Sequence, residues 1–137
     1  MHHWSNDLST GFGAIDHQHQ ELFALVTMLD SALHSPDAQT KRHGIENMIR
    51  FLEQYVEDHF ADEEEIMLSH DYVGYNVHKD DHEIFKARVH SLRHDFDSGL
   101  PIFRVMFALR MFIDKLVHHI KTIDIGIAKL HAKKDGK

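Results

Sequence analysis

The sequence predicts an all-α protein: an antiparallel up-down-up-down four-helix bundle with an N-terminal loop segment and a short C-terminal helical tail. Three observations support this prediction. Apolar residues recur at steps of three and four in four separate stretches, Gly, Pro and Ser residues separate these stretches, and no stretch alternates with the two-residue period of a strand. Helices of about 20 residues joined by short loops are typical of such bundles.

The first predicted helix presents a row of apolar residues that also contains His19. The apolar members of this row are Ile15, Leu22, Val26, Leu29 and Leu33. The row ends at Ser35-Pro36-Asp37. Ser35 could cap the next helix and Pro36 could occupy its first position.

The second predicted helix has two polar residues in its core-facing row, which is Met48, Leu52, Val56, His59, Glu63 and Ile66. Gly74, flanked by Tyr72 and Tyr75, marks the following loop. Polar residues also occupy the core-facing row of the third helix, which is His78, His82, Phe85, Val89, Leu92 and Phe96. Both helices are therefore expected to bring ionisable groups into the core.

Ser98-Gly99-Leu100-Pro101 separates the third helix from the fourth, since Gly suits the residue after a helix and Pro suits a helix start. The row of the fourth helix is Leu109, Phe112, Leu116, His119 and Ile123, with Ile113 and Ile120 beside it. His119 is expected to point inward, and His118 outward.

Composition limits the class of protein. A chain of 137 residues is expected to form one domain, residues 1–137, with a single core. The absence of cysteine excludes disulfides, thiolate zinc sites and iron–sulfur clusters. A net charge of −7 disfavours nucleic acid and anionic membranes as partners. No apolar run is long enough to span a bilayer and no signal peptide is evident, so a cytoplasmic protein is the default expectation. The basic residues near the end are expected to form a solvated tail: Lys129, Lys133, Lys134 and Lys137.

Burial of the polar residues points to a metal. His59 and Glu63, and likewise His78 and His82, are four residues apart and so share a helix face. An ionised carboxylate inside a bundle is costly unless it is paired or coordinates a cation, and no Lys or Arg is positioned to meet Glu63. Five imidazoles and two carboxylates fit iron among the available metals.

Counting ligands makes the prediction specific. If Glu63 and Asp124 bridge two iron ions and an oxo or hydroxo group bridges them too, each iron receives three ligands from the bridges. Three histidines then complete one octahedron, whereas two histidines leave the other with an open position. An ideal helix would separate His119 from Asp124 by about 140° beyond a full turn, so both reach one metal only if the helix distorts or ends there.

Four motifs in order resemble the hemerythrin family, and the single-domain length resembles that of bacteriohemerythrins. Nearly the whole chain, from Trp4 to about Leu130, is covered. The motifs are Ile15-Asp16-His17-Gln18-His19 with Leu22-Phe23, His59-Phe60-Ala61-Asp62-Glu63, His78-Lys79-Asp80-Asp81-His82, and His119-Ile120-Lys121-Thr122-Ile123-Asp124. All seven ligand positions match. The resemblance also implies the pairing of His119 with Asp124.

The resemblance implies that His78, His82 and His119 hold the coordinatively filled iron and that His19 and His59 hold the iron that binds dioxygen. It further implies reversible binding, with both irons passing from ferrous to ferric. The residues that match the oxygen pocket are apolar: Leu22, Phe60, Leu116 and Ile120. They offer no general acid or base, which favours binding over turnover. Lys115 stands where many family members have tryptophan, so one wall of the pocket is expected to be more open.

The remaining polar residues have simpler interpretations. The ten histidines that are not ligand positions are expected at the surface or in hydrogen bonds, and the acidic run from Asp62 to Glu65 is usually a solvated face. Paired Glu-x-x-His motifs of ferritin-like bundles, HExxH and Gly-rich phosphate loops are absent.

Three functions remain open from the same site. The favoured one is an oxygen-binding protein for storage or delivery. The alternatives are an oxygen or redox sensor that acts on an unidentified protein partner, and a di-iron enzyme acting on peroxide or nitric oxide. A monomer is the default expectation for the assembly.

Overall fold

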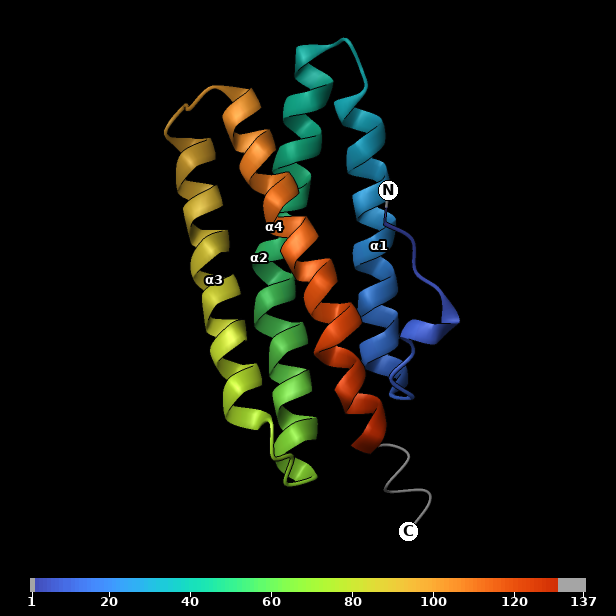
Figure 1. Ribbon diagram of the computed structural model, residues 1–137. Helices are drawn as coiled ribbons and strands as arrows, with labels where there is room; N and C mark the ends of the chain where they lie inside the picture. The colour runs from blue at the N-terminus through green and yellow to red at the C-terminus, as the bar shows by residue number, and fades with distance from the viewer. Residues whose placement is uncertain (1, 131–137) are drawn as a thin grey trace.

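Four long helices, arranged side by side with alternating direction, make up most of the chain in a computed structural model that describes residues 2–130 (Figure 1). They are α1 (Gly13–Leu33), α2 (Ala38–Ser69), α3 (Tyr75–Asp97) and α4 (Ile102–Thr122). Short 3-10 turns precede and follow them, η1 (Asn6–Leu8) and η2 (Asp124–Ile127). The predicted up-down-up-down bundle is confirmed, and no strand occurs within residues 2–130. The helical tail continues to residue 130, and its remaining residues lie outside the described part of the chain.

The start of α2 differs from the sequence prediction. Neither Ser35 nor Pro36 begins the helix: Asp37 is the capping residue, and its carboxylate accepts a hydrogen bond of 3.1 Å from the backbone N–H of Thr40. Ser35 instead accepts a hydrogen bond from the N–H of Asp37. A carboxylate is favoured at this position because it also interacts with the positive end of the helix dipole. The first helical residue is therefore Ala38, two positions later than expected.

The connection between α3 and α4 follows the prediction closely. Helix α3 ends at Asp97, and Gly99 adopts a left-handed φ of +81°, which glycine tolerates best because it has no Cβ. Pro101 caps α4 just before its first helical residue. The resulting reversal places α4 antiparallel to α3, as Figure 1 shows.

The N-terminal loop is anchored to the first turn of α1. One carboxylate oxygen of Asp16 accepts hydrogen bonds from the backbone N–H and the hydroxyl of Thr10, at 2.8 and 2.9 Å. The other oxygen accepts a bond from the Ser9 hydroxyl. These bonds fix where the chain enters the bundle, three residues before His19.

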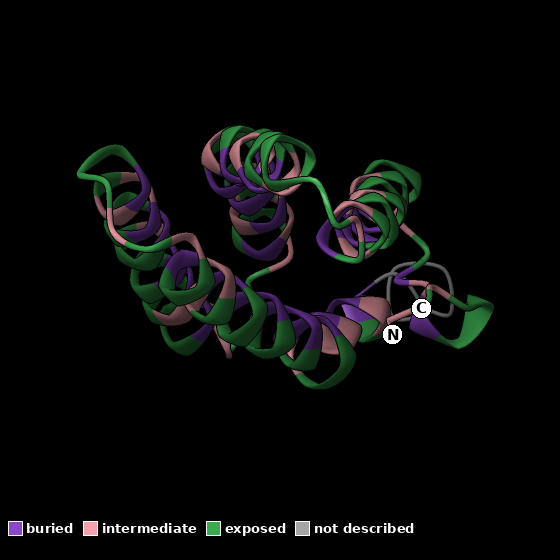
Figure 2. Ribbon diagram, turned by 90° about the horizontal axis from the view of Figure 1, so that it is seen from above, coloured by how far each residue is buried: buried purple, intermediate pink, exposed green. Residues whose placement is uncertain are grey.

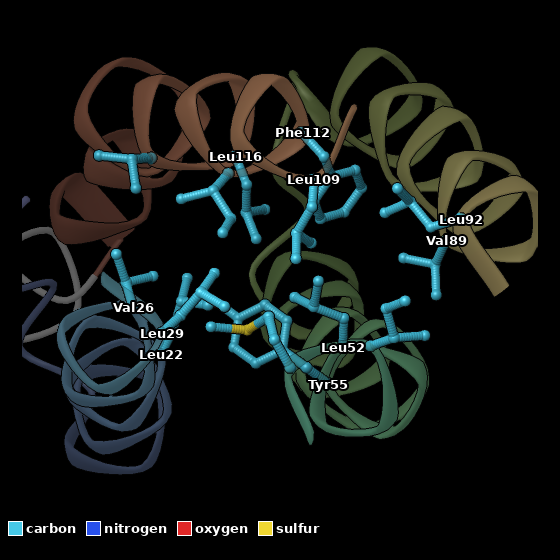
Figure 3. Packing of buried hydrophobic residues seen from close by; sticks show 14 of the residues in the cluster. Leu22, Val26, Leu29, Leu52, Tyr55, Val89, Leu92, Leu109, Phe112 and Leu116 are labelled. Atoms are coloured by element: carbon cyan, nitrogen blue, oxygen red, sulfur yellow. The ribbon is translucent and has the colours of Figure 1, made fainter. Parts of the chain in front are cut away.

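Apolar side chains fill the interior between the helices, and Figure 2 shows the buried residues on the inward side of each helix. In Figure 3, Leu22, Val26 and Leu29 of α1 lie beside Leu52 and Tyr55 of α2, with residues of α3 and α4 opposite them. Two predicted core residues, Ile66 and Ile123, are only half-buried. On α2 the neighbouring Met67 is fully buried instead.

The core consists of two apolar clusters of unequal size. The large one occupies most of the bundle, and the small one contains Met67, Ile127 and Leu130 near the end of α2 and the C-terminal turn. Along α2, Glu63 falls between Phe60 of the large cluster and Met67 of the small one, and near the end of the chain Asp124 falls between Ile120 and Ile127 in the same way. The bundle thus has a polar layer enclosed by apolar packing on both sides.

Candidate metal centre

All seven predicted ligands meet in this polar layer, and each is at most 3 % exposed. Helix α1 contributes His19, α2 contributes His59 and Glu63, and α3 contributes His78 and His82. The last two come from α4 and from the turn after it, His119 and Asp124. Each of the four helices thus supplies at least one imidazole.

The end of α4 explains how His119 and Asp124 share one site despite their five-residue separation. The helix stops at Thr122, and Asp124 begins the 3-10 turn η2. This change of geometry leaves the Asp124 Oδ1 atom 2.8 Å from the His119 Nε2 atom. The expectation that the helix must end or distort between these residues is confirmed.

The side chains form two overlapping groups in which the possible ligand atoms all lie within 4.8 Å of one another. The larger group is Glu63, His78, His82, His119 and Asp124, and the smaller is His19, His59, Glu63 and Asp124. Both carboxylates belong to both groups. The grouping therefore provides three imidazoles on one side and two on the other.

Imidazole nitrogens converge at short range in both groups. The Nε2 atoms of His19 and His59 are 3.0 Å apart, and those of His78 and His119 are 3.2 Å apart. Two neutral imidazoles cannot both present lone pairs to each other favourably, so each pair needs a proton or a cation between its nitrogens. This is the arrangement expected of nitrogens that bind a common positive charge.

Two of the imidazoles are oriented by hydrogen bonds to side chains outside the group. The Nδ1 atom of His59 lies 2.6 Å from the amide oxygen of Gln18, whose amide nitrogen donates to Asp62. The Nδ1 atom of His82 lies 2.8 Å from Glu64. With Nδ1 protonated, each ring directs its Nε2 lone pair to the centre.

His119 has a similar but longer contact, 3.5 Å from its Nδ1 atom to Asp81. The Nδ1 atoms of His19 and His78, by contrast, have no hydrogen-bond partner within residues 2–130. Sequence reasoning missed these orienting residues. Asp62 and Glu64 lie in the acidic run expected to be a solvated face, yet both are half-buried and face inward partners. The only local signal was that Gln18 adjoins His19.

The two carboxylates are held ionised by the surrounding imidazoles. Burial acts to raise the pKa of Glu63, but His59, His19 and His78 outweigh it and hold that pKa well below its usual range. The pKa of Asp124 is likewise lowered, because His119, His19 and His78 outweigh burial and the nearby Glu63. In the metal-free protein these carboxylates in turn affect the imidazoles. Burial lowers the pKa of His19 and His78, but Asp124 and Glu63 outweigh it and raise both pKa values to about 9.

The donor atoms fit a cation better than they fit one another. Neither oxygen of Glu63 accepts a hydrogen bond from residues 2–130, and the Oδ2 atom of Asp124 and the Nε2 atom of His82 are also without hydrogen-bond partners there. Within the same residues, no Lys or Arg lies within ion-pairing distance of either carboxylate. Buried charged oxygens need such a partner, so the cluster is able to hold metal.

Comparison with known proteins places this chain in a family. The family model of the hemerythrin HHE cation binding domain matches residues 10–130. The chain belongs to the hemerythrin family. The motif resemblance seen in the sequence is thereby confirmed.

Relatives of this hemerythrin domain extend over nearly the whole chain. A bacteriohemerythrin of Pseudomonas paraeruginosa is 34 % identical over 90 % of this chain and 76 % of its own length. Another bacteriohemerythrin, from Stenotrophomonas maltophilia, is 32 % identical over 91 % of this chain and 78 % of its own length. Myohemerythrin of Sipunculus nudus is 31 % identical over 88 % and 86 %. No solved structure gave a significant match.

The apolar residues expected to line the oxygen pocket of the hemerythrin domain are all buried: Leu22, Phe60, Leu116 and Ile120. The Phe60 ring lies parallel to the His82 ring at a centroid distance of 3.9 Å, so it packs directly on a predicted ligand. Lys115 is exposed and faces outward between α3 and α4, where a surface cavity of about 320 Å³ also reaches His119. Among the other histidines, His17 and His118 are exposed, as expected.

No helix within residues 2–130 is both long enough and apolar enough to span a membrane.

Proposed function

We propose that this hemerythrin domain holds two iron ions and binds dioxygen reversibly. The observation that supports this most strongly is the pair of overlapping ligand groups, which share two carboxylates and differ by one imidazole. An unequal pair of sites is what a centre needs if one metal is to be saturated while the other keeps a position for a small ligand.

In this proposal Glu63 and Asp124 bridge the two ions. His78, His82 and His119 complete the ligands of one ion, and His19 and His59 are the remaining ligands of the other. A ferrous pair would supply two electrons and an open coordination position. Two dications among five neutral imidazoles and two carboxylates would also provide positive partners for the four orphaned donor atoms described above.

The role of the surrounding residues is to exclude water and withhold protons. Leu22, Phe60, Leu116 and Ile120 contribute no ionisable group, and all are nearly inaccessible to solvent. A dry pocket without a general acid or base disfavours proton-driven conversion of a bound ligand. We therefore infer reversible binding, as in storage or delivery, rather than turnover.

Gln18 and Glu64 set the orientation of the ligand rings on the two sides of the centre. His82 is paired with a carboxylate, and His59 with a neutral amide. A carboxylate partner raises the basicity of an imidazole more than an amide does. The two ions are therefore expected to differ in electron richness as well as in ligand number.

The test is a metal analysis followed by a cycle between air and argon. The reduced, iron-loaded protein should contain two irons per chain and develop a visible charge-transfer band in air that disappears under argon over several cycles. His59→Ala should abolish the band, whereas the exposed His118→Ala should keep it. A single irreversible change to a ferric spectrum would refute reversible binding, and one iron per chain would refute the paired centre.

A further inference from the structure

Tyr55 has a hydroxyl group for which the protein supplies no partner. The residue lies on α2, one turn before His59, and is only 5 % exposed. Its hydroxyl oxygen is buried and makes no hydrogen bond with residues 2–130. Buried tyrosine hydroxyls usually find a partner, so this one requires an explanation.

The position of the ring connects Tyr55 with the metal centre. It stacks on the His59 ring at a centroid distance of 4.5 Å and an angle of 20°, and it meets the edge of Phe60 at 6.0 Å. His59 is a proposed ligand on the side with the open position, and Phe60 is a proposed wall of the oxygen pocket. Tyr55 is therefore in contact with two residues that the proposed function places around the ligand-binding iron.

Packing alone accounts for the ring but not for the hydroxyl. Tyr55 belongs to the large apolar cluster with Leu22, Leu52 and Leu116, and Phe51 lies 5.5 Å from it. Phenylalanine would provide the same apolar contacts without burying a polar atom, and at lower cost. The hydroxyl is thus a buried donor without an acceptor in the described protein.

A surface cavity of about 130 Å³ lies between α1 and α2 and borders both Tyr55 and His59. Gln18, Phe51, Tyr55 and His59 are among the residues that line it. The hydroxyl oxygen itself is not accessible to solvent, so water in this cavity does not reach it. The cavity therefore supplies no partner for the hydroxyl.

We propose that the Tyr55 hydroxyl donates a hydrogen bond to the small exogenous ligand of the centre, dioxygen or a small anion that takes its position. This inference rests on the proposed function and adds a polar contact to a pocket whose other walls are apolar. The ligand gains negative charge when it binds to a reduced metal, and a buried phenol hydroxyl is a suitable donor to such a group. Tyr55 would therefore slow ligand release without taking part in metal binding.

The experiment compares Tyr55→Phe with the unmodified protein in three measurements. Azide affinity of the ferric, iron-loaded protein is measured by absorbance titration, and dioxygen release from the reduced protein is followed by stopped flow. A net hydrogen bond corresponds to roughly a 3- to 10-fold effect, so azide should bind 3- to 10-fold more weakly and dioxygen should leave 3- to 10-fold faster. A solvent deuterium effect on the release rate should be present in the unmodified protein and lost in Tyr55→Phe.

The third measurement is urea unfolding of the metal-free protein. Because the hydroxyl has no protein partner, Tyr55→Phe should be at least as stable as the unmodified chain. The matched control is Tyr75→Phe at the start of α3, whose ring lies near Lys79 and which should change none of the ligand measurements. The iron content of both variants should stay at the value of the unmodified protein.

Two results would overturn the inference: unchanged azide affinity and dioxygen release in Tyr55→Phe, or a lower stability of the metal-free variant, which would reveal a partner within the protein. Failure of the proposed function looks different. If dioxygen binding is irreversible but azide still binds more weakly to Tyr55→Phe, reversible binding is refuted and the hydrogen bond from Tyr55 is supported.

Discussion

Removing the metal should give the protein a pH dependence of stability opposite to that of the iron-loaded form. In the metal-free protein, the pKa values of His19 and His78 rise from an ordinary 6.5 to about 9, because Asp124 and Glu63 outweigh the effect of burial. A raised folded-state pKa adds stability that is fully present below pH 6.5 and is lost as the pH rises through 9. The free energy of unfolding of the metal-free protein should therefore decrease as the pH rises from 6.5 to 9.

The size of this effect follows from the number of protons that the folded chain retains. Between about pH 7 and 8.5 each of the two imidazoles holds a proton that the unfolded chain has released, and each such proton contributes a slope of about −1.4 kcal/mol per pH unit. Both imidazoles depend on the same two carboxylates, so the total lies between one and two protons. The free energy of unfolding should fall by about 2 to 4 kcal/mol over this range.

Bound iron should reverse the sign, because the same imidazoles must lose their protons to act as ligands. The measurement is urea unfolding followed by circular dichroism at several pH values between 6.5 and 9, with and without iron. In the metal-free protein, His78→Gln should reduce the slope of unfolding free energy against pH by up to the contribution of one proton. The exposed His94→Gln serves as the control for loss of a histidine. A metal-free stability that is constant or increases from pH 7 to 8.5 would refute the proposed electrostatics of the cluster.

Three further predictions concern single side chains. Glu64→Gln replaces the carboxylate that orients His82 at 2.8 Å and should lower iron affinity roughly 10- to 100-fold, measured by chelator competition, with the helical content unchanged. Gly44→Ala would place a methyl group 2.6 Å from the Cβ of Ala32. This overpacking should lower the free energy of unfolding by about 1 to 3 kcal/mol, measured by urea unfolding, and the additional change Ala32→Gly should restore it. Phe60→Ala empties a fully buried position against His82 and should cost about 3 to 5 kcal/mol; a loss below 1 kcal/mol would show that the site collapses around it.

The helices were predictable because each has a continuous row of apolar residues. The polar residues within those rows could be identified because they occupy positions that are expected to be buried. Glu63 and His82 could be singled out for this reason, as residues whose burial needs compensation. The start of α2 was less predictable. Ser35, Pro36 and Asp37 are all compatible with a helix start, and the choice depends on which side chain reaches the free N–H groups.

The residues that orient the proposed ligands could not be predicted from the apolar pattern. Asp62 and Glu64 lie in a run of acidic residues, and only the packing of α1 and α3 against α2 turns them toward Gln18 and His82. Tyr55 was equally hidden, because it lies outside the predicted core-facing row of α2 and the sequence does not reveal that its hydroxyl is buried without a partner. Such contacts join residues distant in sequence, and hydrophobic periodicity contains no information about them.

The two loops farthest from the metal centre offer a practical opportunity for protein engineering. The turn between α1 and α2 and the turn between α3 and α4 lie together at one end of the bundle, and the seven ligand positions lie toward the other (Figure 1). Several residues in these turns, including Ser98 and Gly99, are exposed, and none of the seven proposed ligands lies in them. A reporter peptide or a second protein inserted there would leave the ligand geometry intact. Under the proposed function, an output attached at these turns would lie at the opposite end of the bundle from the oxygen-binding centre.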